Sequence, residues 1–235
     1  MDQILQSYVT RFISDNSFSH LGEATAFEYF TNKVILSRIY PESFDLSMID
    51  VGGGHDNGID GLAIFVNDHI VSTKEEVDYF REKFFRFDIK FVFIQSKRSK
   101  QFESGALSKF LDGVCRFFKK DSTMPHNQKI SDFRALKDYI YSFSIDMNDK
   151  LPSCEMYYVA TGEWLNDKVL ESLVQEKKSI LLNEKIFNNG NVNFFPVDGE
   201  KLKRLYLEEN QKVTREIYFE KIQQCRPYKK FTKLI

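Results

Sequence analysis

Two apolar runs, each with polar side chains at one end, constrain this sequence most. The first covers residues 59–66 and has Asp60 near its start. The second covers residues 89–94 and gives way abruptly to Gln95, Ser96 and Lys97. Short, almost continuous apolar runs are typical of strands that are buried on both faces of a sheet. The sequence therefore predicts a buried sheet that carries polar groups at the ends of two strands.

The spacing of these polar residues predicts that three of them converge. Side chains alternate between the faces of a strand, so Gln95 and Lys97 share one face and Ser96 points to the other. If residues 60–66 and 89–97 pair antiparallel, Asp60 lies beside the end that bears Gln95 and Lys97.

The remaining pattern predicts an α/β (α+β) fold with one central mixed β-sheet flanked by helices. A helix over residues 22–39 should end before Pro41, and one over 72–85 begins at a capping box of Ser72 with Glu75 or Thr73 with Glu76. Further helices are expected at residues 107–118, 165–176, 199–207 and 212–224, and further strands at 44–51, 155–161 and 192–197. We expect one domain over residues 1–205 and a helical carboxyl-terminal extension over 206–235.

Composition narrows the functional classes. The formal net charge of -1 excludes a globally basic coat for nucleic acid, so any such contact needs a local patch. No apolar run reaches the roughly 18 residues of a membrane span, and residues 1–20 alternate apolar and polar, unlike a signal peptide. The three cysteines lack metal-ligand or disulfide spacing. We expect a cytoplasmic protein with free thiols and no membrane partner.

The predicted cluster has the chemistry of metal-assisted phosphodiester hydrolysis. A hard divalent cation prefers oxygen ligands, which Asp60, the side-chain carbonyl of Gln95 and a backbone carbonyl near Ser96 would supply. Lys97 would orient or help deprotonate the attacking water, or neutralise charge that develops on phosphorus.

These residues resemble a known family. Residues 52–61 read GGGHDNGIDG, residues 93–99 read FIQSKRS and residues 109–114 read KFLDGV. Together they resemble the amino-terminal domain of AIPR (abortive infection phage resistance) proteins. The Phe27-Glu28 pair in residues 26–30 also resembles the first helix of Mrr-like restriction endonucleases. The resemblance covers about residues 20–120.

The resemblance implies a PD-(D/E)xK restriction-endonuclease-like core, Mg²⁺ or Mn²⁺ as cofactor, and a role in bacterial defence against phage. It implies that Glu28 or Glu23 supplies a further carboxylate to the metal. Gln95 stands where many relatives have glutamate, which removes one negative charge, although Mrr-like members share the glutamine. AIPR proteins are typically much longer than this chain.

The same residues also allow other interpretations. The glycine-rich stretch 52–61 lacks GxxxxGK[ST], and Asn57 breaks GxGxxG, so a nucleotide loop is disfavoured. A calcium loop fails because the twelfth position from Asp56 is Asn67. Arg98 and Lys100 are either a solvated charge run or phosphate contacts, and His55 is a turn residue or a weak substrate contact.

We therefore expect a metal-dependent endonuclease that acts on DNA. The alternatives are a binding module of the same fold that has lost turnover, and a metal-dependent ribonuclease. Cutting both strands of a duplex favours two sites, hence a homodimer or a partner from the defence system.

Overall fold

The computed structural model describes residues 1–84, 87–120, 125–147, 151–188 and 190–210. Its centre is a five-stranded mixed sheet in the order β2-β1-β3-β4-β5. The strands are β2 (His69–Val71), β1 (Gly61–Val66), β3 (Ile89–Lys97), β4 (Ser153–Ala160) and β5 (Val192–Val197). β1 pairs antiparallel with β2 and β3, whereas β3, β4 and β5 run parallel. The predicted mixed α/β architecture is confirmed.

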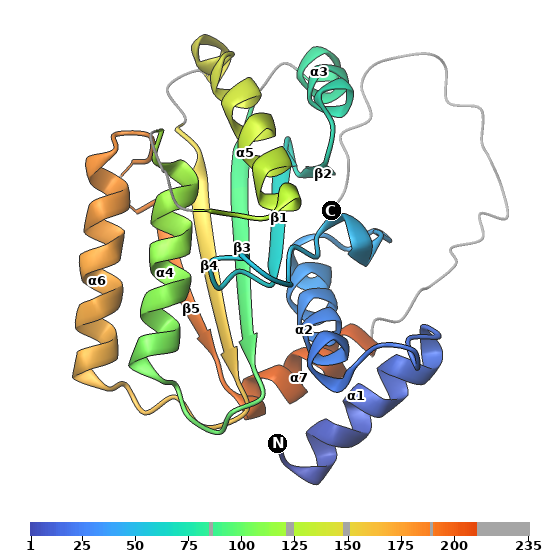
Figure 1. Ribbon diagram of the computed structural model, residues 1–235. Helices are drawn as coiled ribbons and strands as arrows, with labels where there is room; N and C mark the ends of the chain where they lie inside the picture. Colours follow the sequence, from blue (N-terminus) through green and yellow to red (C-terminus); the bar gives the residue numbers. More distant parts are fainter. Residues whose placement is uncertain (85–86, 121–124, 148–150, 189, 211–235) are drawn as a thin grey trace, which may run out of the picture.

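Helices cover both faces of this sheet (Figure 1). On one face lie α3 (Lys74–Lys83), α4 (Ser104–Phe118), α5 (Gln128–Tyr141) and α6 (Lys168–Asn183). On the other lie α1 (Gln3–Asp15), α2 (Glu23–Ile39) and α7 (Gly199–Asn210). None of the described helices is both long and apolar enough to cross a membrane.

Alternation along the central strands divides the core into two clusters. Phe91 and Phe93 of β3 pack in the cluster under α4 and α5, whereas Val92 and Ile94 pack in the cluster under α2 and α7. All four side chains are fully buried. Burial of apolar surface on both faces explains why these strands read as continuous apolar runs.

Several sequence predictions are confirmed, among them the helix that ends before Pro41 and the strand at residues 192–197. The capping box of α3 is the one formed by Thr73 and Glu76. The predicted strand at residues 44–51 is wrong: Asp45 accepts a hydrogen bond from Ser47 N–H and caps the short 3₁₀ helix η1 (Leu46–Met48). Only an isolated bridge between Asp50 and Gly61 extends the sheet there.

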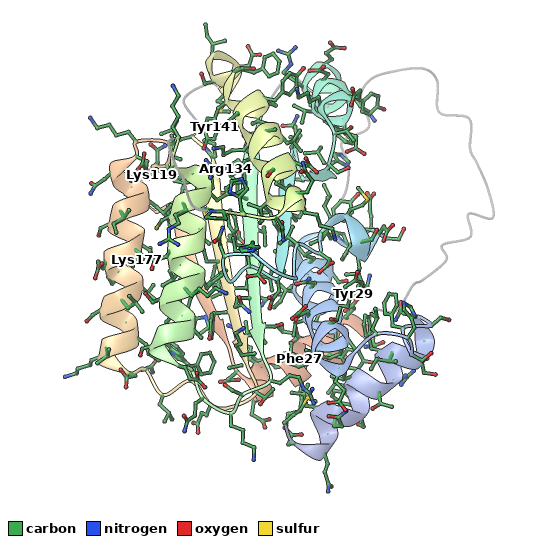
Figure 2. The ribbon with its side chains drawn as sticks, viewed as in Figure 1. Phe27, Tyr29, Lys119, Arg134, Tyr141 and Lys177 are labelled. Carbon is green, nitrogen blue, oxygen red and sulfur yellow. The ribbon has the colours of Figure 1, made fainter. Side chains whose placement is uncertain are left out.

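The sequence pattern did not predict α1, α5 and β2 or the two short 3₁₀ helices. The 3₁₀ helix η2 (Ser144–Met147) follows α5. Arg134 of α5 donates hydrogen bonds to the carbonyl oxygens of Arg116 and Lys119, and so closes the carboxyl end of α4 (Figure 2). The predicted helix at 212–224 lies outside the described residues. Tyr206, past the predicted domain boundary at 205, is buried in the second cluster, with its ring against Tyr8 of α1 and Phe30 of α2.

Close packing of α4 on the glycine-rich loop gives a stability prediction. A methyl group at Gly113 would overlap the carbonyl oxygen of Asn57, which is backbone and cannot swing aside. We expect Gly113→Ala to lower the free energy of unfolding by about 2 kcal/mol or more. Gly105, on the same helix, has nothing within 4 Å of its added Cβ. Gly105→Ala should be neutral or stabilising by up to about 1 kcal/mol. Urea unfolding measures both, and equal stabilities would contradict the close contact.

Candidate active site

The pairing of β1 with β3 brings the predicted polar residues together. Gly61 is opposite Ile94 in the antiparallel register, and the backbone N–H of Asp60 donates to the Ile94 carbonyl oxygen at 2.9 Å. Asp60 therefore stands beside Gln95 and Ser96 at the end of β3. The predicted antiparallel arrangement is confirmed.

One oxygen of Asp60 is saturated with hydrogen bonds. Its Oδ2 accepts from Ser96 N at 2.7 Å, from Ser96 Oγ at 3.1 Å and from Gln95 Nε2 at 2.7 Å. Within the described part of the chain no donor reaches Oδ1. The carboxylate is thus fixed through one oxygen, and the other is left for a ligand.

Gln95 is held in the same way through its nitrogen. Besides Asp60 Oδ2, Nε2 donates to the carbonyl oxygen of Ser96 at 3.0 Å. Both donors of the amide group are used, whereas its oxygen Oε1 accepts no hydrogen bond from any described residue. Alternation predicted that Ser96 points to the opposite face from Gln95, yet the Ser96 hydroxyl donates to the same Asp60 oxygen.

Glu28 of α2 brings a second carboxylate to the group. Burial raises its pKa to about 7, helped by the negative charges of Asp60, Asp50 and Asp56 and opposed by Lys97. Burial likewise raises the pKa of Asp60 to about 6, opposed by the Ser96 N–H and Lys97. Burial and neighbouring negative charge thus disfavour the ionised forms of both carboxyl groups, and a bound cation would favour those forms.

Asp50 also belongs to this acidic group, although no sequence motif marks it. A Cβ added at Gly52 would lie 3.0 Å from Glu28 Oε2 and 3.3 Å from Asp50 Oδ1, so the glycine leaves room for both carboxylates. Burial and the neighbouring Asp50 carboxylate raise the pKa of Tyr29 of α2 (Figure 2). The carboxylate of Asp50 also accepts from Lys129 Nζ at 3.0 Å.

The glycine-rich loop is fastened from α4 and α5. Asn127 donates its side-chain N–H to the Val51 carbonyl oxygen at 2.9 Å, and its backbone N–H to the His55 carbonyl oxygen at 3.1 Å. Lys109 of α4 pairs with Asp56 at 3.6 Å. The loop that leads into Asp60 is therefore held by helices from elsewhere in the chain.

Lys97 supplies the positive charge of the site. It is half-buried at the end of β3, and its charge lowers the pKa of both Glu28 and Asp60. It forms no ion pair with any residue that the structure describes. Its ammonium group is therefore available to an incoming anion.

The remaining predicted residues lie at the rim. Glu23 is 81% exposed and pairs with Arg98 at 2.7 Å, so these two neutralise each other outside the acidic group. His55 and Lys100 are exposed on their loops. The structure thus brings Asp60, Gln95, Lys97 and Glu28 together and places the other four around them.

The chemistry of this donor set fits a hard divalent cation. The free oxygens of Asp60 and Gln95, together with the Glu28 carboxylate, are the ligand types that Mg²⁺ and Mn²⁺ prefer. Among the described residues, no three His, Cys, Asp or Glu side chains stand close enough together to hold an ion. Binding would thus need the Glu28 side chain to turn toward Asp60.

No protein-family model, curated protein or solved structure matches this chain. A functional assignment therefore rests on the residues of the site.

The raised pKa of Glu28 gives a stability prediction. Because the folded state binds this proton more tightly than the unfolded state, the carboxyl group costs stability as the pH rises from its ordinary pKa of 4.5 through about 7. Discounted for solvent screening of a half-buried group, Glu28→Gln should stabilise the cation-free protein by about 1–2 kcal/mol at about pH 8 and by less than half of that at about pH 5. Thermal unfolding at the two pH values measures the difference. The exposed Glu82→Gln change should show none, and a destabilised Glu28→Gln protein at the higher pH would contradict the raised pKa.

Proposed function

We propose that this protein is a metal-dependent endonuclease that hydrolyses phosphodiester bonds of DNA. The observation that carries the proposal is a group of four side chains near the adjoining ends of β1 and β3, namely Asp60, Gln95, Glu28 and Lys97. Lys97 forms no ion pair with any described residue. Carboxylate and amide oxygens beside a free ammonium group are what cation-assisted attack on a phosphate requires. The sequence resemblance to the PD-(D/E)xK nuclease domain of AIPR proteins supports the same reaction class and a role in phage defence.

In this proposal each residue has a distinct task. Asp60, Gln95 and Glu28 would hold Mg²⁺ or Mn²⁺, which supplies a Lewis acid beside the phosphate and lowers the pKa of the attacking water. Lys97 would orient that water or stabilise the charge that develops on phosphorus. Ser96 positions Asp60 through its backbone N–H and its hydroxyl. Arg98 and Lys100, at the rim, would contact flanking phosphates.

A second candidate is a binding module of the same fold that docks nucleic acid or a partner protein without cutting it. Gln95 directs its nitrogen, rather than its oxygen, at Asp60. Such a module needs no cation. The two candidates therefore differ in whether Mg²⁺ or Mn²⁺ binds at Asp60.

Cleavage assays test the proposal directly. With Mg²⁺ or Mn²⁺, the protein should cut supercoiled plasmid and linear duplex DNA. Asp60→Asn and Lys97→Met should each lower the rate by about 100-fold or more, because the first removes a negatively charged ligand of the cation and the second removes the positive charge beside the phosphate. Lys83→Met, an exposed lysine on α3, should retain the native rate.

Each outcome has a distinct meaning when the thermal unfolding of every variant is recorded alongside. Cutting of single-stranded RNA in preference to DNA would make the protein a ribonuclease. A folded protein that binds no Mg²⁺ or Mn²⁺ at Asp60 and cuts neither substrate would support the binding module. A plasmid nicked first and then linearised would fit one site per chain, with duplex cleavage completed by a homodimer or a defence partner.

The raised pKa values of the Asp60 and Glu28 carboxyl groups predict how cation binding depends on pH. A cation must displace the protons held by Asp60, with a pKa of about 6, and by Glu28, with a pKa of about 7. The affinity for Mn²⁺ should therefore rise about tenfold or more from about pH 6 to about pH 8. In Glu28→Gln only the smaller contribution of Asp60 should remain. Calorimetric titration at several pH values measures this, and a flat profile in the native protein would contradict competition between protons and cation.

A further inference from the structure

The hydroxyl group of Tyr158 is buried, and none of the residues that the structure describes hydrogen-bonds to it. Tyr158 is fully buried in β4, and its ring lies against Phe110 at 6.0 Å and Phe102 at 5.8 Å between centroids. A phenylalanine would make the same ring contacts, so packing does not explain the hydroxyl. A buried polar group without a partner costs stability, and a group that persists in this state calls for another explanation.

The position of Tyr158 in the sheet provides an explanation for its hydroxyl group. In the parallel pairing of β3 with β4, Tyr158 is opposite Gln95, so the two side chains are neighbours on the same face of the sheet. The negative charges of Glu103 and Asp60 add to burial in raising the pKa of this phenol. The Tyr158 side chain is therefore next to Gln95 on the sheet, and the Asp60 charge of the proposed cation site acts on its hydroxyl.

We infer that Tyr158 is a positioning residue of that site, whose hydroxyl hydrogen-bonds to a water molecule taken up with the cation beside Asp60 and Gln95. The inference rests on the proposed function. Water is the ligand because the hydroxyl is shut off from a substrate as large as DNA, whereas a cation brings its own hydration shell into the site. Residues that bond to the ligands around a metal typically change its affinity by about 10-fold to 100-fold when they are removed.

Tyr141 of α5 provides a matched control. Its hydroxyl is also buried and has no partner within the described part of the chain. Its ring, labelled in Figure 2, stacks on Phe91 with a centroid distance of 6.2 Å. Phe91 is earlier on β3 than Gln95, about 13 Å away along the strand. Burial, followed by Cys154 and no carboxylate, raises the pKa of Tyr141. It therefore shares the unpartnered hydroxyl of Tyr158 without the neighbouring site.

The experiment compares Tyr158→Phe and Tyr141→Phe in the full chain. Thermal unfolding without cation should show that neither change lowers the melting temperature, because neither hydroxyl has a partner to lose. Calorimetric titration with Mn²⁺ should then show binding about tenfold weaker in Tyr158→Phe and unchanged in Tyr141→Phe.

Three contrary results distinguish a failure of the inference about Tyr158 from a failure of the proposed nuclease function. A lower melting temperature in cation-free Tyr158→Phe would reveal a structural partner and overturn the inference. Native Mn²⁺ affinity in Tyr158→Phe would overturn it as well, while the proposed nuclease stands. A native protein that does not bind Mn²⁺ at all would instead remove the proposed function on which the inference rests.

Discussion

The hydrogen bonds to Oδ2 of Asp60 tie the start of β1 to the end of β3. Backbone, hydroxyl and amide donors from Ser96 and Gln95 all converge on this one oxygen. Because a single buried carboxylate accepts them all, it fixes the relative position of two strands and the direction of the Gln95 amide at once. The loop that precedes Asp60 is also tied to α4 and α5 through Lys109 and Asn127.

Around that fixed point the protein accumulates negative charge at a cost to its own stability. Glu28 and Asp50 approach each other over Gly52, and Asp60 lies close enough to raise the pKa of Glu28. Elsewhere in the described chain acidic side chains are mostly exposed or paired, as Asp112 is with Lys177 (Figure 2). Local charges that disfavour the folded state are expected where a ligand compensates for them.

Local pattern predicted much of the fold, and long-range contacts account for what it missed. Continuous apolar runs identified β1 and β3, and their pairing placed Asp60 beside Gln95. The alternation assumed for residues 1–20 was wrong, because Leu5, Val9 and Phe12 follow helical spacing in α1. For α5 a local signal does exist, because Asn127 is its N-cap and Ile130 is its first buried residue. By contrast, nothing local marks Asp50 or Tyr158, whose importance depends on Glu28 and Gln95 far away in the sequence.

The residues that form and support the site come from the helical layers on both faces of the sheet, so a newly made chain must pack both layers to assemble it. Glu28 comes from α2, which packs in one hydrophobic cluster, whereas the loop before Asp60 is held by α4 and α5, which pack in the other. A chain in which either layer has not yet docked holds only part of the proposed catalytic group. The full set of these side chains is therefore assembled only after both helical layers have packed onto the sheet.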